Sequence, residues 1–582
     1  MKEIEHNTDL CIIGGGISGV CAAISAARHN VKVVLMQDRP VLGGNASSEI
    51  RMWICGAHGK DNRETGILEE LELENLYRNP ESNYHIWDSV LYEKVKAEKN
   101  IKLLLNCTCI ECDVADNNIV SVRGWQLTSE TYHKIKAKLF ADCSGDSILA
   151  PLSGAEYRIG REASSEFDES IEPPEADTKT MGMSILFQIR ETDSPKIFIP
   201  PAFAYRYEND DAFPFKKLSM REHDKTTNFW WIELGGENDS IHDTENIKDE
   251  LLKISFGIWD HMKNHGDHDM ENWVLEWIGF LPGKRESRRY IGDYIMTQND
   301  VLAKGMFDDI VAYGGWSMDD HHPAGFMYDG NPTIFHPAPS PYGIPYRCLY
   351  SKNIENLFMA GRNISVTHAA LSSTRVMGTC STLGQAVGTA AYIAITEGIT
   401  PREVYVNKLQ QLKQQLMDDD CYLPFNIRPV SELTLKAKIS SSDSKDAPEI
   451  VRNGHDRPVN DQKNLWTGEL GSSIIFEFDK PEQITGIRII FDSNLNRNFR
   501  NMPCFYPLDA KQRAVPETLI KEFLIETSDD GKTYIENFHE TNNYQRHINK
   551  KINISNRLIK ITFLKTWGHT NVNVFSIDLF SD

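Results

Sequence analysis

Three glycines near the start of the chain have the spacing of a phosphate-binding turn. Gly14, Gly16 and Gly19 form a G-x-G-x-x-G pattern, with an apolar run before it and an alanine-rich segment after it. In such a pattern the first glycine permits a tight turn, the second lets the backbone approach a pyrophosphate, and the third lets the helix pack closely on the strand. The helix N-terminus then offers free N–H groups to the anion. The stretch therefore predicts a strand–turn–helix unit that binds a dinucleotide.

Four histidines are candidates for the base that removes a substrate proton. Removing a hydroxyl proton during hydride transfer needs a group that titrates near neutral pH, as histidine does. The four are His58 in RMWICGAHG, His321 and His322 in WSMDDHHPAG, and His368 in THAALSSTR. For His58 the alternative is a loop residue without a chemical role. The Asp-Asp-His-His run lacks the spacing that would bring all four side chains to one metal ion.

A basic cluster stands out in an acidic chain. The segment GKRESRR (283–289) contains four basic residues, Arg285 and Arg288 among them. One interpretation is a solvated, charged turn that pairs internally with Glu286. The other is that Arg285 or Arg288 binds a substrate carboxylate, a reduced-cofactor anion or a cofactor phosphate. The sequence leaves both open.

Composition limits the classes of partner. Acidic residues outnumber basic ones by 83 to 62 in 582 residues, for a formal charge of −21. This charge repels phosphate backbones and anionic lipid, so we expect neither nucleic acid nor membrane as a partner. The first ten residues lack the apolar core of a signal peptide. The most apolar window, 376–395, contains a GxxxG and several hydroxyl side chains, which favours a soluble helix packed closely on another element.

The cysteines point to a reducing compartment. Eleven cysteines without an export signal favour the cytoplasm. Cys107, Cys109 and Cys112 form the only cluster, and no second pair follows that would complete a zinc site. We interpret them as packing thiols, and the sequence predicts no metal site.

The secondary-structure pattern changes twice along the chain. Strand–helix–strand patterns run to about residue 165, and an irregular stretch rich in Pro, Trp and His follows, with an amphipathic helix expected near 245–264. An apolar strand at 353–362 then precedes a long small-residue helix. From about 431, short alternating runs separated by turn residues are typical of a β-sandwich.

Four segments carry a resemblance to known flavoproteins. DRPVLGGNASSE, FADCSGDSILAPLSGAEYR, NLFMAGRNIS and RVMGTCSTLGQAVGTAA occur in the order of the flavin-contacting elements of glutathione-reductase-like FAD oxidoreductases. With LPGKRESRRYIGDY, they resemble the FAD-dependent oxidoreductase family that includes many bacterial glycan-associated members. The resemblance covers about residues 8–425 and implies FAD as the cofactor.

The resemblance also implies which residues contact FAD. They are Gly14, Gly16, Ile17, Ser18, Gly19, Gln37, Asp38, Arg39, Gly43, Gly44, Asn45, Ala46, Ser47, Ser144, Gly145, Asp146, Gly361, Arg362, Arg375, Gly378 and Thr379. Gln37 stands where an acid usually accepts hydrogen bonds from ribose hydroxyls. We expect its carbonyl to hold one hydroxyl without a charge, as a variant way of binding the adenosine.

The implied fold class is an α/β Rossmann-like FAD-binding domain with an inserted α+β substrate domain, followed by an all-β jelly-roll sandwich. We expect FAD-binding segments at 1–165 and 345–428, a substrate or cap domain at 166–344, and the sandwich at 431–582. The C-terminal strings SDDGKTY and APEIVRNGHDRPVNDQKNLWTGE resemble discoidin-like, galactose-binding-like modules. Trp466 in the second string is either a core anchor or a sugar platform.

The leading hypothesis is a cytoplasmic FAD-dependent oxidoreductase that oxidises a CH–OH group of a small polar substrate, with sugars favoured. No second G-x-G-x-x-G follows, so we expect the substrate or an external electron carrier to reduce the flavin. One alternative is fumarate-reductase-like reduction of an unsaturated acid. Another is a non-catalytic, flavin-stabilised protein that binds glycans or proteins. The oligomeric state is left open.

Overall fold

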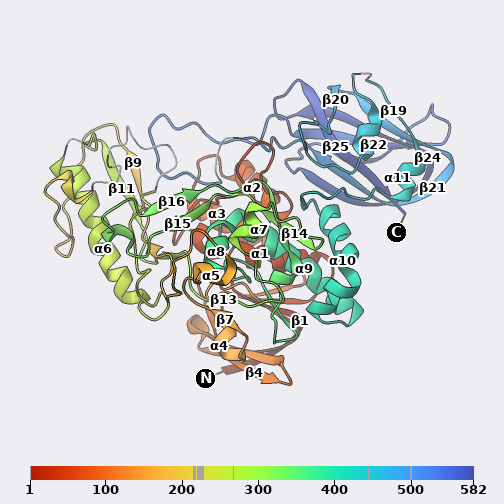
Figure 1. The fold of residues 1–582 in the computed structure, drawn as a ribbon. Helices are drawn as coiled ribbons and strands as arrows, with labels where there is room; N and C mark the ends of the chain where they lie inside the picture. The colour runs from red at the N-terminus through yellow and green to blue at the C-terminus, as the bar shows by residue number, and fades with distance from the viewer. Residues whose placement is uncertain are drawn as a thin grey trace. The chain divides into compact units, whose positions relative to one another are not determined.

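The computed structural model describes residues 2–213, 218, 228–266, 268–443, 445–497 and 501–581. The chain folds into two compact units, each discontinuous in sequence (Figure 1). The first comprises 1–58, 81–412 and 500–512, and the second comprises 59–80, 413–499 and 513–582. Among the described residues no helix is long and apolar enough to cross a membrane.

The first unit is built on a mixed sheet with a parallel core. The strand order is β3-β2-β1-β6-β5-β4, and β18 pairs with β6. The strands are β1 (Lys2–Ile13), β2 (Val33–Met36), β3 (Ile101–Leu104), β4 (Cys107–Ala115), β5 (Asn118–Gln126), β6 (Thr131–Asp142) and β18 (Leu357–Met359). Strands β1, β2, β3, β6 and β18 run parallel, so their carboxyl ends meet at one edge of the sheet.

Two helices of this unit pack at unusually short range. α1 (Ile17–Arg28) lies against α9 (Met377–Glu397), which contains the predicted GxxxG. A Cβ on Gly384 would lie 2.0 Å from the Ser18 carbonyl oxygen, and one on Gly388 would lie 2.4 Å from that of Ala22. The close packing predicted for the 376–395 helix is confirmed, and these glycines are its cause.

Smaller elements complete the first unit. Its other helices are α3 (Tyr84–Ala97), α4 (Leu149–Ser153), α5 (Ser164–Phe167), α6 (Thr244–Asp260), α7 (Gln298–Leu302), α8 (His368–Thr374) and the start of α10 (Pro401–Asp418). The short strands are β7 (Tyr157–Arg158), β8 (Met183–Ser184), β9 (Phe187–Glu191), β10 (Glu233–Leu234), β11 (Trp273–Ile278), β12 (Gly283–Lys284), β13 (Arg289–Tyr290), β14 (Ile310–Gly314), β15 (Met318–His321), β16 (Thr333–His336) and β17 (Tyr342–Pro345).

The predicted amphipathic helix corresponds to α6, which continues into a π-helical turn at His261–His265. The buried face of α6 packs with β9 and β11 around a separate apolar core (Figure 1). Its members include Phe187, Ile254 and Trp259.

The second unit is built mainly of β-strands, with α2, α11 and the end of α10 beside them. Its strand order is β20-β25-β21-β24-β22-β23, with β19 paired to β21. The elements are α2 (Ile67–Arg78), α11 (Glu432–Lys436), β19 (Lys438–Ser441), β20 (Trp466–Glu469), β21 (Ser473–Phe491), β22 (Ile520–Ser528), β23 (Ile535–Glu540), β24 (His547–Thr566) and β25 (Asn571–Phe580). Trp466 is fully buried and packs against Phe563, so it is a core residue and no exposed platform.

Two segments belong to a different unit from the one expected from their position in the sequence. α2 follows the predicted nucleotide-binding turn in sequence, yet Leu73 and Leu76 lie in the core of the second unit. Conversely, residues 501–512 interrupt the predicted sandwich but belong to the first unit. There the Asn501 side-chain oxygen accepts a hydrogen bond from the Ile54 backbone N–H at 3.1 Å. The alternation of apolar and polar residues along the sequence does not show which of the two units a segment packs in.

Candidate functional site

The glycine turn joins β1 to α1 with almost no free space. Gly14 has a φ of +101°, and a Cβ there would lie 2.5 Å from the Cys143 backbone. A Cβ on Gly19 would lie 1.9 Å from the Gly14 carbonyl oxygen. Gly16 differs, because a Cβ there would contact only Gly44 Cα at 3.9 Å. Gly14 and Gly19 are therefore required by packing, whereas Gly16 keeps a cavity open.

The N-terminus of α1 is available to an anion. Gly16 is its N-cap, and no side chain caps the first turn. Its first N–H groups thus have no intrahelical acceptor, which is the arrangement that binds phosphate. Gln37 braces the turn, since its side-chain oxygen accepts a hydrogen bond from the Gly15 N–H at 2.7 Å. Its amide donates to the Val41 carbonyl at 3.2 Å, so the predicted contact with a ribose hydroxyl stays a prediction.

A half-buried acid, Asp146, binds two basic side chains at the cavity wall. Asp146 accepts hydrogen bonds from Arg362 at 2.6 Å, Lys284 at 2.9 Å and Ser287 at 2.8 Å. Burial alone would raise the pKa of Asp146, but Arg362 and Lys284 lower it to about 2. Asp146 is therefore ionised throughout the neutral range, and it fixes Arg362 beside the glycine turn.

One cavity of about 1000 Å³ connects these elements to the carboxyl edge of the sheet. Most of the residues predicted to contact FAD line it. They are Gly14, Gly16, Ile17, Ser18, Gln37, Asp38, Arg39, Gly43, Gly44, Asn45, Ser144, Gly145, Asp146, Gly361, Arg362 and Arg375. The other five predicted residues, which are Gly19, Ala46, Ser47, Gly378 and Thr379, lie outside the lining that the structure describes.

Part of the cavity wall is aromatic. Trp53, Trp230, Trp231 and Trp316 line it, and the His58 ring stacks on Trp316 with ring centroids 4.3 Å apart. Cys504 and Phe505, from the 501–512 segment, pack in the same apolar cluster as Trp53. The sequence did not assign these two residues to the site, because they lie within the predicted sandwich.

Five charged side chains form a row of contacts at the cavity wall. His321 lies between two carboxylates, with its Nδ1 2.6 Å from Glu233 and its Nε2 3.2 Å from Asp319. Arg285 lies 3.4 Å from Glu233, and Arg375 lies 3.1 Å from Asp319. All except Glu233 line the cavity. The Arg375 Nε is buried without a hydrogen-bond partner among the described residues.

The charges in this row determine the protonation of its members. Burial alone would lower the pKa of His321, but Glu233 and Asp319 outweigh it and raise that pKa above its ordinary value. Burial would raise the pKa of Asp319, whereas His321 and Arg375 lower it to about 2. With His321 protonated, the row carries three positive and two negative charges, a net charge of +1.

Three predicted catalytic residues do not reach the cavity lining. His322 stacks on Tyr328, and its Nδ1 accepts a hydrogen bond from the Ala324 N–H at 3.2 Å. Arg288 donates to the Asp146 carbonyl oxygen at 3.3 Å. His368 is buried, with its Nδ1 2.8 Å from Glu286. His58, Arg285 and His321 do line the cavity, so the structure brings together half of the predicted set.

His368 belongs to a buried network of acids. Glu286 also pairs with Arg289, which contacts Glu162 at 2.7 Å. Burial would lower the pKa of His368, but Glu286 and the nearby Asp320 carboxylate raise it well above its ordinary value. The 283–289 segment combines parts of both interpretations. Arg289 pairs internally with Glu286. Lys284 and Arg285 line the cavity, where the other interpretation places a binding role.

Glu233 and Trp230 are the functional residues that sequence reasoning missed. Glu233 lies 88 positions before His321 in an irregular stretch, and a short strand, β10, brings it to β15. The Trp230 carbonyl accepts a hydrogen bond from Arg285 at 3.0 Å, which fixes the aromatic wall. The feature of the sequence that could have indicated these two residues is the run WWIE (230–233) within a charged region.

The family follows from a comparison over most of the first unit. The profile of the family described as "FAD dependent oxidoreductase" matches residues 9–412. The chain belongs to this family. It is an FAD-dependent oxidoreductase, and its cofactor is FAD. The open cradle at Gly16 and the uncapped start of α1 fit the pyrophosphate of this cofactor, so the expected cofactor and enzyme class are confirmed.

Curated relatives match the oxidoreductase only locally. It is 46% identical over 43 residues to a soluble pyridine nucleotide transhydrogenase from Marinobacter nauticus, covering 7% of this chain and 9% of the relative. It is 46% identical over 44 residues to an iron-sulfur component of the CoB–CoM heterodisulfide reductase from Methanopyrus kandleri, covering 8% and 7%. The chain thus spans less than a tenth of either relative's length.

Two solved carbohydrate-binding modules are similar to part of the oxidoreductase. A family 32 carbohydrate-binding module of Streptococcus pneumoniae EndoD matches at 11% identity and a TM-score of 0.21, covering 26% of this chain and all of the module. The family 32 module of Clostridium perfringens NanJ, solved with galactose, matches at 12% identity and a TM-score of 0.19, covering 26% and 97%.

Proposed function

We propose that the oxidoreductase oxidises a CH–OH group of a small polar substrate, with carbohydrates as the favoured class, and that His321 accepts the hydroxyl proton. Bound FAD supplies the hydride acceptor, its N5 atom. One observation carries the proposal: His321 lies between Glu233 and Asp319, beside Trp230, in the cavity that the glycine turn also lines.

The two carboxylates determine which ring nitrogen of His321 accepts the substrate proton. Glu233 accepts the Nδ1–H, so Nε2 is the atom that is free to take a proton when the ring is neutral. Asp319, 3.2 Å from Nε2, then stabilises the imidazolium that forms. This is the base–orienter arrangement that general base catalysis needs.

The cavity wall supports a sugar-like substrate. Trp53, Trp230 and Trp316 offer apolar ring faces on which the CH face of a cyclic substrate packs. Asp319 and Arg375 offer charged partners for hydroxyl groups in the same cavity. A cavity that combines an apolar wall with a few convergent polar groups is typical of a small-molecule site.

The lining also supports the domain roles expected from the sequence. We propose a Rossmann-like FAD-binding domain within 1–165 and 345–428, apart from 59–80 and 413–428, which belong to the second unit, together with a substrate domain at 166–344 and a jelly-roll sandwich within 431–582. Residues of the first three ranges line the cavity, for example Gly14, His321 and Arg362. We further propose that an external acceptor reoxidises the flavin. The expected cytoplasmic location stays a prediction.

Arg375 favours a second candidate, the reduction of an unsaturated carboxylic acid. Its Nε is buried without a partner among the described residues, and the row around His321 carries a net positive charge. In that reaction Arg375 would bind the carboxylate and protonated His321 would donate a proton to carbon. The proton then moves in the opposite direction from that of CH–OH oxidation.

Anaerobic mixing tests the proposal. We expect at least one neutral sugar or sugar acid to bleach the oxidised flavin of the FAD-loaded enzyme, because the site accepts a proton and a hydride from one substrate. Unsaturated acids are mixed in parallel with the dithionite-reduced enzyme. If only these acids cause a reaction, by reoxidising the flavin, the second candidate replaces the first.

A further inference from the structure

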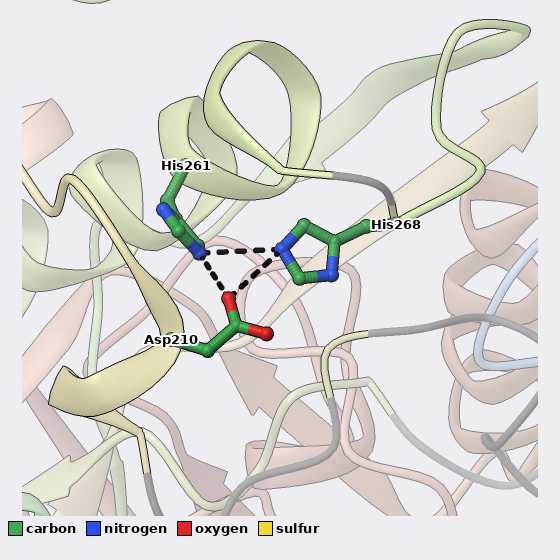
Figure 2. A group of neighbouring side chains, drawn as sticks. All are labelled: Asp210, His261 and His268. Atoms are coloured by element: carbon green, nitrogen blue, oxygen red, sulfur yellow. Dashed lines mark hydrogen bonds and ion pairs between the residues drawn. The ribbon is translucent and has the colours of Figure 1, made fainter.

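Three side chains away from the flavin cavity converge on one point (Figure 2). Asp210 lies in the turn Asp210–Ala212, His261 starts the π-helical turn after α6, and His268 follows that turn. His261 Nε2 is 2.7 Å from Asp210 Oδ1 and 3.2 Å from His268 Nε2. His268 Nε2 is 3.2 Å from the same carboxylate oxygen. We propose that these residues bind a divalent transition metal of the zinc class.

The tautomer of His261 supports a ligand role. Its Nδ1 lies 2.8 Å from the Tyr207 carbonyl oxygen, which can only accept a hydrogen bond, so Nδ1 carries the hydrogen. In the neutral ring Nε2 then has a free lone pair, and it points at a carboxylate oxygen, which is also an acceptor. Either a proton on Nε2 or a metal ion bound between the two atoms resolves this contact. A backbone carbonyl that holds the other ring nitrogen is the usual outer partner of a metal-binding histidine.

The distances agree with metal coordination. Ligands at about 2.0–2.2 Å from a tetrahedral zinc ion lie about 3.3 Å from one another. The two contacts of His268, both 3.2 Å, match this spacing. The shorter 2.7 Å contact requires a small outward movement of Asp210, whose side chain is exposed. Two imidazoles and one carboxylate suit zinc and its neighbours better than magnesium or calcium, which prefer oxygen ligands.

The surroundings hold the two histidines in place and leave Asp210 accessible to solvent. His261 and His268 are buried, and the Phe213 ring lies 5.3 Å from that of His261, so both histidines are held in place. Exposed Asp210 leaves a fourth position to water. Single π-helical turns within helices are frequent at functional sites. None of the three residues lines the flavin cavity, so the metal would tie the Asp210 turn to the end of α6.

Zinc titration of the chelator-treated, FAD-loaded full chain tests the site. We expect one Zn²⁺ per chain in the wild type, and binding weakened at least about tenfold in His268→Gln and in Asp210→Asn. Asp210→Asn alters only an exposed side chain, so it keeps the test valid where His268→Gln fails to fold. His265→Gln, on the same turn but outside the cluster, is the matched control and should bind as the wild type does.

A second readout separates ligation from adventitious binding. Co²⁺ in place of Zn²⁺ should give visible ligand-field bands in the wild type and in His265→Gln, and these should be lost in Asp210→Asn. Zinc binding that is absent in the wild type, or equal in all four proteins, would overturn the proposal. Flavin reduction by substrate is measured separately and has no bearing on the result.

Discussion

His321→Gln is expected to slow reduction of the bound flavin by substrate by about 10²–10⁴-fold, which is the usual contribution of a general base. Glutamine fits the space between Glu233 and Asp319 and keeps hydrogen-bonding capacity, but it accepts no proton. FAD content should stay at one per chain, because His321 is not among the residues predicted to contact FAD and its ring contacts Glu233 and Asp319. Stopped-flow absorbance of the flavin under anaerobic conditions measures the rate.

His322→Gln is the matched control for this substitution. His322 is adjacent in sequence but lies outside the cavity lining, stacked on Tyr328. We expect its rate to lie within about threefold of the wild-type rate. Equal rates for His321→Gln and His322→Gln would remove His321 from the chemistry.

Gly19→Ala is expected to abolish FAD retention and to destabilise the first unit by about 3 kcal/mol or more, the upper range for overpacking. The added Cβ would lie 1.9 Å from the Gly14 carbonyl oxygen, so either α1 or the glycine turn must move. The flavin-to-protein absorbance ratio after gel filtration measures retention, and thermal unfolding measures stability.

Two further glycine substitutions separate packing from cofactor binding. Gly16→Ala places its Cβ 3.9 Å from the nearest atom, so we expect normal folding but weaker FAD binding. Gly486→Ala, in β21, meets nothing closer than 3.5 Å and should change neither property. Full flavin content and an unchanged melting temperature in Gly19→Ala would show that packing at the turn does not require Gly19.

Local features of the site were predictable, while long-range partnerships were not. Gly14 was assigned to a tight turn and Gly19 to close packing of the helix, and the structure gives Gly14 a φ of +101° and leaves no room for a Cβ at either position. The small residues Gly384 and Gly388 likewise predicted close helix packing. A glycine motif indicates that a backbone will approach closely, because glycine has no Cβ, but it does not identify the residue that approaches.

The contacts between charged residues could not be predicted from the sequence. The sequence offered His321, His322 and His368 as equivalent candidates, and only the fold distinguishes them. His321 meets Glu233 across 88 positions, whereas His368 meets Glu286 in a buried network away from the cavity. The proposed metal ligands Asp210 and His261 are 51 positions apart. No periodic pattern links residues at such separations.

The pH dependence of flavin reduction tests directly whether His321 accepts a proton from the substrate. Because the neighbouring carboxylates raise the pKa of His321, the rate with an oxidisable sugar should increase as pH rises through values above 6.5, where the ring loses its proton. Glu233→Gln removes one of these carboxylates, so the increase should move to lower pH. A rate that falls as pH rises, or a profile that Glu233→Gln leaves unchanged, would contradict the account.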